Sequence, residues 1–460
     1  MSVDLRLSEI QRQADKLAKE ENPKPDFTIP SDCDVTGDNL LEIVDTESKG
    51  KGFYAKAAIK AGTTLLAAKP ISMVMAWEEE DDEMDEDEEM DMDEDDDGMV
   101  MKGSKRNGML ILRTLDQIKA DPDIWESKLT NLFPRDFSDK IWICECAQTG
   151  MEIEESFNSL SSVCKFDESL VDEIRHRLPL IIRYNCLSCE TGAELFVHPN
   201  RAAGGHCSLS GTGLFYYPSY FNHSHKPNVV RYSIGDVMFF VTNQDIQKGQ
   251  ELCISYIESE HLCEDAKTRT RLLDMDFEEK GESSSKEESN KKFPVVDVDM
   301  QDDLMSIHPL ERLHEIKELL KEACSDETTL DEEGEAISFF KADEHQLRIL
   351  LALTYESLGQ HSYAFEEWEK CIHFATNHLP PNDENCIALL VQGALSAQAI
   401  SNWKAVKEYS KKATDIHDLL FGGGVAFFRQ RYEKEIKLQL RPTSKKVLSG
   451  EAAFDLIWKE

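Results

Sequence analysis

The sequence has little positive charge for its length. Its 460 residues include 51 Lys and Arg against 89 Asp and Glu, which gives a formal net charge of -38 at pH 7. An excess of this size repels phosphate backbones and anionic headgroups, so direct binding to nucleic acid or to an anionic membrane surface is excluded as a main role. Basic protein partners fit this charge better.

Long apolar runs are also missing. No stretch of about 18 apolar residues occurs, and no apolar run follows a basic start, so we expect neither a membrane span nor a secretory leader. The expected location is the cytoplasm, the nucleus or both. The twelve cysteines are scattered, and in a reducing compartment such cysteines are free thiols or metal ligands before they are disulfides.

A regular metal-binding spacing is absent as well. Short cysteine and histidine pairs occur at Cys186-x-x-Cys189, Cys144-x-Cys146, His206-Cys207 and His261-x-Cys263. They could in principle assemble a zinc site, but they lack a consistent partner spacing, and half-buried cysteines on strands are commoner. We therefore expect no metal.

One segment, residues 78–97, carries seventeen acidic side chains in twenty positions. Like-charge repulsion of this density defeats a packed core, so the sequence predicts a disordered acidic loop. Two interpretations stay open. It is a solvated loop, or it attracts basic substrates electrostatically in a salt-dependent way.

The most informative stretch is Tyr220-Phe221-Asn222-His223-Ser224-His225-Lys226-Pro227-Asn228. It is followed by a hairpin pattern over residues 229–241 and then by Gly249-Gln250-Glu251-Leu252-Cys253-Ile254-Ser255-Tyr256. Polar side chains between aromatic and β-branched neighbours suit a buried backbone crossing, in which Asn and His side chains satisfy amide groups. The second stretch is typical of a short strand that ends near a tyrosine.

Further strands are expected on both sides of a helical block. Residues 41–44 and 63–67 read as strands around a G-K-G-F-Y-A turn at residues 50–55. Residues 109–171 show helical periodicity interrupted by Pro134. The β pattern resumes at residues 181–189, 194–197 and 213–216.

This order of motifs resembles the SET domain, the fold of most protein lysine methyltransferases, and in particular the branch with MYND fingers and helical repeats. The resemblance implies an α+β fold, a split SET-domain β-fold with a helical insertion, followed by an all-α tetratricopeptide-like domain. A MYND finger is absent. The post-SET cysteines are absent too, with His225 in the position of the zinc-binding cysteine, so the prediction of no metal stands.

The resemblance also implies S-adenosyl-L-methionine as cofactor and Tyr256 as the catalytic tyrosine. It places the cofactor against the glycine-lysine turn, the N-H pair, the tyrosine and a later phenylalanine: Lys49, Gly50, Lys51, Asn222, His223, Tyr256 and Phe277. Leu187 stands where relatives often have a second cofactor-binding asparagine. Each of three residues also has a purely structural interpretation. Tyr256 would cap the core, Asn222 would bond to amides of the turn, and Phe277 would be an ordinary core residue.

A repeat marks the C-terminal part, which is predicted to be helical from Met305 onward. Ala364-Phe365-Glu366-Glu367-Trp368 recurs as Ala405-Val406-Lys407-Glu408-Tyr409, an offset of 41 residues. This recurrence indicates paired antiparallel helices of tetratricopeptide type, which could hold a peptide partner. Trp368, Trp403 and Tyr409 are interpreted as packing residues rather than a ligand cage.

The domain organisation predicted from these patterns has five parts. They are a polar N-terminal segment (1–39), a SET domain (40–256, with the acidic loop 78–97 and a helical insertion 108–180), a diverged post-SET segment (257–277), a linker (278–303) and a helical domain (304–460). The leading hypothesis is methyl transfer from S-adenosyl-L-methionine to lysine of a basic protein, a histone or another lysine-rich tail. The alternative is a catalytically weak SET scaffold that binds basic proteins through its acidic loop and helical repeats.

Overall fold

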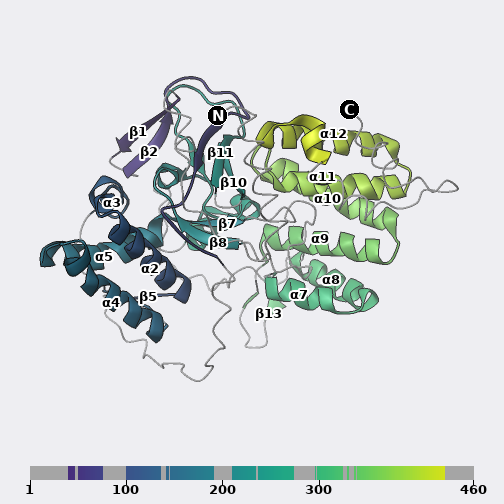
Figure 1. The fold of residues 1–460 in the computed structure, drawn as a ribbon. Helices are drawn as coiled ribbons and strands as arrows, with labels where there is room; N and C mark the ends of the chain where they lie inside the picture. The colour runs from purple at the N-terminus through teal and green to yellow at the C-terminus, as the bar shows by residue number, and fades with distance from the viewer. Residues whose placement is uncertain are drawn as a thin grey trace.

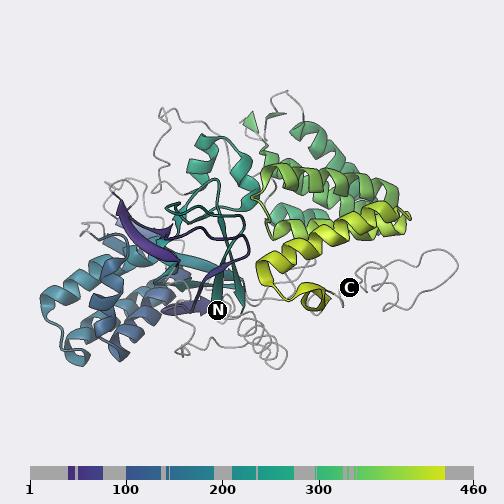
Figure 2. The same ribbon diagram turned by 90° about the horizontal axis from the view of Figure 1, so that it is seen from above.

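A strand-rich centre lies between two groups of helices, α2–α5 on one side and α7–α12 on the other (Figures 1 and 2). The computed structural model describes residues 40–46, 50–75, 100–135, 141–144, 146–190, 210–234, 237–273, 296, 298–324, 329–330, 336–337, 339–429 and 432. The acidic segment 78–97 and the predicted strand at 194–197 lie outside these residues. Within the described residues, no helix is long and apolar enough to cross a membrane.

The centre consists of short antiparallel sheets and one parallel pair. β1 (Leu41–Thr46) and β2 (Gly50–Ala55) form a hairpin. β10 (Val229–Ile234), β11 (Val237–Thr242) and β3 (Thr64–Ala68) form a sheet in the order β10-β11-β3, and β4 (Ser72–Met75), β8 (Ser210–Leu214) and β7 (Cys186–Glu190) form another in the order β4-β8-β7. β9 (Asn222–His223) pairs in parallel with β12 (Cys253–Ile254). The hairpin predicted at residues 229–241 is confirmed by the pairing of β10 with β11.

The first helical group has a core around the buried Trp125, Phe157 and Leu178, which it shares with Val74 of β4 and Leu214 of β8. It contains α2 (Lys105–Ala120), α3 (Asp123–Ser127), η2 (Leu129–Asn131), α4 (Ala147–Val163) and α5 (Glu168–Asn185), together with a parallel pair of β5 (Val100–Gly103) and β6 (Ile141–Cys144). These elements lie in the sequence between β4 and β7, so they form an excursion from the central sheets.

The strand predicted from Ile181 is wrong in its first half, because α5 continues through Asn185. Ile181 and Ile182 are fully buried on this helix, and a short apolar run reads alike as a buried strand or a buried helix. The side-chain amide of Asn185 donates to Ile181 O at 2.7 Å, which satisfies a carbonyl of the last turn. The strand then begins at Cys186.

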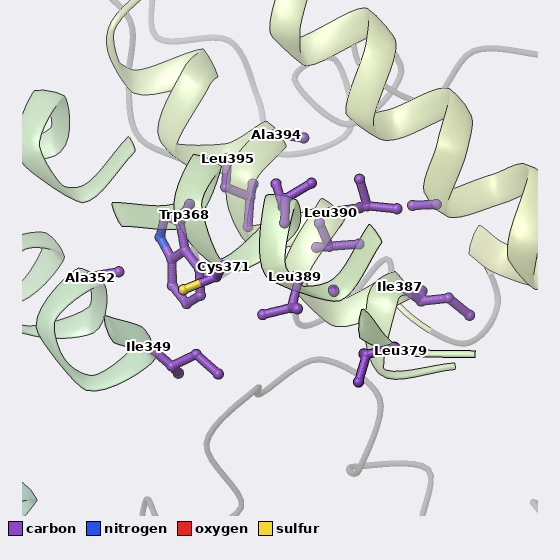
Figure 3. Close-up of a cluster of buried hydrophobic side chains, with 14 of the residues drawn as sticks. Ile349, Ala352, Trp368, Cys371, Leu379, Ile387, Leu389, Leu390, Ala394 and Leu395 are labelled. Carbon is purple, nitrogen blue, oxygen red and sulfur yellow. The ribbon is translucent and has the colours of Figure 1, made fainter. Parts of the chain in front are cut away.

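The C-terminal helices stack side by side (Figure 1). After η5 (Ser259–Cys263) and α6 (Ala266–Leu272) come α7 (Val298–Ser306), α8 (Pro309–Ala323), a small hairpin of β13 (Thr329–Leu330) and β14 (Ala336–Ile337), α9 (Lys341–Ser357), α10 (His361–His378), α11 (Asn385–Ala399) and α12 (Trp403–Phe421). Figure 3 shows Trp368 and Cys371 of α10 among aliphatic side chains of α9 and α11. The predicted linker 278–303 overlaps the start of α7.

These helices share a hydrophobic core with the β10–β11 face of the central sheet. The rings of Tyr232 and Phe421 lie 4.5 Å apart between centroids. Polar contacts reinforce the junction, since Asn382 Nδ2 donates to Asn243 O at 2.8 Å and Ser259 Oγ donates to Asp383 Oδ2 at 2.7 Å. The helical region is therefore packed directly onto the sheet of β10 and β11, the two strands that connect β9 to β12 in the sequence.

Candidate active site

The predicted polar crossing forms where two chain segments run side by side. β9 and β12 pair with Asn222 opposite Cys253 and His223 opposite Ile254. The backbone N–H of Ser224 then donates to Ile254 O at 3.0 Å. Below the crossing, the Phe221 ring is fully buried and stacks on Phe240 at 4.5 Å between centroids. This packing of Phe221 fixes the position of the residues that follow it, Asn222 and His223.

Two buried asparagines hold the crossing together. Asn228 Oδ1 accepts from Cys253 N at 2.8 Å, and Asn228 Nδ2 donates to Glu251 O at 2.8 Å. The N–H of Asn243 donates to Asn228 O at 3.2 Å. An amide side chain can satisfy one donor and one acceptor of the neighbouring backbone at once, which explains an asparagine at a buried crossing of this kind. Asparagine side chains of the quoted motif were expected to satisfy backbone amides, as Asn228 does, whereas Asn243 was not singled out.

Asn222 reaches from the crossing to β2. Its Nδ2 donates to Glu251 Oε1 at 2.9 Å. A Cβ added at Gly52 would lie 2.5 Å from that Nδ2 and 3.2 Å from Glu251 Oε1. A side chain at residue 52 would therefore have to displace the Asn222–Glu251 pair, which occupies the space that its Cβ would need. The structure brings Gly52 of β2 next to Asn222 of the N-H pair.

The residues predicted as a turn, 50–55, form strand β2 instead, paired with β1 along its whole length. Gly50 has a φ of +70°, and a Cβ there would meet nothing within 4 Å. Lys51 Nζ donates to Asn131 Oδ1 at 3.3 Å, so its ammonium group lies beside η2 of the helical excursion. Lys49 lies outside the described residues. Asn131 was not singled out in the sequence, and no short-range pattern relates it to Lys51.

Tyr256 is held at both ends by the crossing. Its backbone N–H donates to His223 Nδ1 at 3.0 Å, and its phenol donates to Phe221 O at 2.8 Å. The first bond requires an unprotonated Nδ1, so the neutral imidazole carries its proton on Nε2. Burial, followed by the charges of Cys253 and Glu251, raises the pKa of Tyr256 above its ordinary value, and the phenol stays neutral at physiological pH.

A cavity of about 250 Å³ lies beside Tyr256. Its walls come from the junction of α5 and β7, from the segment before β9, from β10 and from the end of α6: Arg183, Tyr184, Asn185, Cys186, Leu187, Ser188, Pro218, Ser219, Arg231, Tyr256, Leu272 and Leu273. Leu187, which takes the place of an asparagine expected from the resemblance, is part of this lining. Phe277 lies outside the described residues, and α6 closes the cavity just before it. The two arginines were missed in the sequence, where neither belongs to a motif.

The described residues do not bring three or more His, Cys, Asp or Glu side chains together in a group that could hold a metal ion. Cys189 is buried and Cys186 is half-buried on β7. His206 and Cys207 lie outside the described residues.

Known proteins are similar to parts of this chain. The family model described as SET domain matches residues 50–257. A protein of Saccharomyces cerevisiae described as "Potential protein lysine methyltransferase SET6" is 46% identical over 87 residues, which is 19% of this chain and 23% of that protein. The chain thus spans less than a quarter of the length of this curated relative.

Among solved structures, one titled "Crystal structure of the SET domain of LSMT bound to Lysine and AdoHcy" aligns with 98% of this chain and 87% of its own, at 12% identity and a TM-score of 0.26. A similarity this low adds nothing to the description of the site. Strands β2 to β12, the crossing and Tyr256 fall within the matched range 50–257, whereas β1 and the hairpin of β13 and β14 lie outside it. Residues 50–257 are therefore similar to the SET domain, and a C-terminal region of helices α7–α12 with one small hairpin follows them.

Proposed function

We propose that the protein is an S-adenosyl-L-methionine-dependent methyltransferase that modifies lysine of a protein substrate. The observation that carries the proposal is the position of Tyr256, a neutral phenol held by the Asn222–His223 crossing on one side and bordering a cavity on the other. The match of residues 50–257 to the SET domain supports it.

Side chains of β2 and of the crossing have the chemistry that the cofactor requires. S-adenosyl-L-methionine carries a carboxylate, an ammonium group and a sulfonium. The Lys51 ammonium group is suited to the carboxylate. The Glu251 carboxylate and the carbonyl of the Asn222 amide are suited to the positively charged groups. We propose that Lys49, Gly50, Lys51, Asn222, His223 and Tyr256 hold the cofactor and that Phe277 closes the site.

The cofactor supplies the electrophilic methyl group, so the protein needs no nucleophile of its own. The chain has to orient a neutral lysine amine and to favour the positive charge shared by the methyl and the amine. Tyr256 is suited to this task because a hydroxyl that donates to Phe221 O still presents oxygen lone pairs as acceptors. Its raised pKa keeps it from acting as the base at neutral pH.

The helical region has features that favour a tetratricopeptide-like arrangement. Ala364 and Ala405, which are equivalent in the sequence repeat, are both buried, and so are Phe365 and Val406. α9, α10, α11 and α12 lie next to one another in chain order (Figure 1). We propose that this region and the acidic segment 78–97 bring basic proteins to the enzyme.

Calorimetry with S-adenosyl-L-methionine tests the proposal. We expect the whole protein to bind the cofactor and Asn222→Ala to weaken binding by at least about tenfold, because it removes an amide from the site and leaves Glu251 without that donor. Asn377→Ala, at an exposed position on α10, is the matched control and should leave affinity unchanged. No binding at millimolar cofactor would overturn the proposal.

A further inference from the structure

The cavity beside Tyr256 has a charge opposite to that of the chain as a whole. Arg183 and Arg231 both line it, whereas none of the described residues that line it is an Asp or a Glu. Among the described residues of the lining the charge is therefore positive, opposite in sign to the net charge of -38 of the whole protein. The lining therefore indicates a ligand with negative charge at this place.

The two arginines reach the cavity from different elements. Arg183 belongs to the last turn of α5, where a cation also suits the negative end of the helix dipole. Arg231 belongs to β10, and its Nη1 and Nη2 donate to Ser188 O and Ser188 Oγ at 2.7 and 3.2 Å. The two bonds to β7 fix the plane of the Arg231 guanidinium before any ligand arrives. A pre-organised guanidinium binds a carboxylate with less loss of side-chain freedom than a lysine would.

An apolar surface adjoins the arginines. Phe133 is 59% exposed, and its ring lies 5.2 Å from that of Tyr184 in an edge-on arrangement. Tyr184 lines the cavity next to Arg183. The loop that carries Phe133 is fixed at this place because Asn185 Nδ2 donates to Phe133 O at 2.5 Å. A large exposed aromatic ring held at the edge of a cavity is suited to contact with a partner chain.

We infer that the methyl-accepting lysine has acidic neighbours in its substrate, whose carboxylates bind Arg183 and Arg231 while an apolar side chain packs on Phe133. This inference rests on the proposed methyl transfer. It also restricts the partner, because a uniformly basic tail would place lysines or arginines against the two guanidinium groups. A substrate that is basic elsewhere but has Asp or Glu beside the target lysine complements both the net negative charge of the chain and the positive charge of the cavity.

Short peptides with a central lysine test the inference. Three versions of the peptide carry Glu, Gln or Lys on both sides of the lysine. Fluorescence anisotropy measures their binding to the full chain, and mass spectrometry measures their methylation. We expect the Glu peptide to bind and to react about tenfold better than the Gln peptide and the Lys peptide to be the poorest. Equal or better binding of the Gln or Lys peptide would overturn the inference.

Charge reversal assigns the preference to the cavity. Arg183→Glu should abolish the advantage of the Glu peptide and favour the Lys peptide, whereas Arg113→Glu, at an exposed position on α2 outside the cavity, should leave the order unchanged. Arg183→Gln serves as a second variant if the reversal disturbs folding, and it should remove the preference without inverting it. An unchanged order in both Arg183 variants would contradict the inference.

The experiments distinguish failure of this inference from failure of the proposed function. If Arg183→Gln weakens S-adenosyl-L-methionine binding while the Glu preference persists, the arginine serves the carboxylate of the cofactor and the inference is wrong. If the full chain neither binds the cofactor nor methylates any peptide, the proposed function fails, while anisotropy still decides the charge preference of the cavity.

Discussion

At the scale of single residues, Tyr256 is the group whose position gives the site its chemistry. Its backbone and its phenol bond to two neighbouring residues of the same crossing, His223 and Phe221. Its orientation therefore follows from the path of the chain and does not require a ligand. The phenol hydroxyl contributes little to the fold beyond one hydrogen bond, so its removal separates chemistry from stability.

Tyr256→Phe should lower the rate of methyl transfer about a hundredfold, because it deletes the dipole proposed to favour the transferring methyl. Cofactor affinity should change little, since the ring and the crossing remain. Single-turnover rates and calorimetry on the same preparation measure the two effects. Tyr363→Phe, at an exposed position on α10, is the control. Unchanged turnover in Tyr256→Phe would remove the proposed role of the tyrosine.

Gly52 is the second residue with a sharp expectation. Gly52→Ala places a methyl group 2.5 Å from Asn222 Nδ2 and should displace the amide from Glu251. We expect a loss of about 1–3 kcal/mol in the free energy of unfolding together with weaker cofactor binding. Gly150→Ala, on α4, is the matched control, because its added Cβ would lie at an ordinary distance of 3.7 Å from the Cβ of Cys144. Denaturant unfolding of both variants decides the matter, and equal stability of Gly52→Ala and the parent chain would contradict the packing argument.

At the scale of elements, the contacts between α9 and α10 predict a dependence of stability on pH. His345 of α9 is 2% exposed, and its ring stacks on Phe374 of α10 at 4.2 Å. Burial, with smaller contributions from His378 and Arg348, lowers the pKa of His345 to about 3. The unfolded chain binds a proton near pH 6.5 that the folded chain does not accept until about pH 3. Stability is therefore full above pH 6.5 and falls as the pH decreases through that window.

His345→Phe should reduce this dependence. Between pH 6.5 and pH 5 the parent chain should lose up to about 2 kcal/mol more unfolding free energy than the variant, because each pH unit in the window is worth about 1.4 kcal/mol. Urea unfolding at the two pH values measures the difference. His373→Gln, at an exposed position on α10, should behave like the parent chain. Parallel losses in His345→Phe and the parent chain would show that His345 is not the titrating group.

The elements also show how far sequence reasoning reaches. The hairpin of β10 and β11 follows from turn residues and from alternation of apolar side chains, which are local signals. The pairing of β9 with β12 joins segments about thirty residues apart, and it was expected from the order of motifs that resembles the SET domain. The end of α5 does not follow from local signals, since the Ile181–Ile182 pair is apolar in either conformation. Arg183 and Arg231 were missed for a different reason. They belong to separate elements, and only the packing of β10 against β7 places both at one cavity.

At the scale of the whole molecule, the sheet and the C-terminal helices share one core. Phe421 of α12 is fully buried against Tyr232 of β10, and Leu419 O would lie only 2.8 Å from a Cβ added at Gly62, in the loop before β3. Two parts joined in this way should lose their structure together rather than one after the other.

Phe421→Ala should therefore destabilise both parts, by about 3–5 kcal/mol for a large cavity in a shared core. Native-state hydrogen exchange measures it, and amides of β10 and β11 should lose protection along with those of α11 and α12. Leu310→Ala, at a position on α8 that is 59% exposed, is the control and should cost little. Loss of protection restricted to the helices would show that the two parts are independent folding units.

The pairing of Tyr54 with Glu251 has a consequence for folding during synthesis on the ribosome. Translation delivers β1 and β2 to the exit tunnel long before residue 251 is made, so the hairpin spends that interval without the neighbour that completes its outer edge. The earlier residues of the cavity, Arg183 and Arg231 included, are synthesised before the segment that contains Glu251 and Tyr256. A chain that stops before residue 250 lacks Tyr256, Leu272 and Leu273, and with them one wall of the cavity.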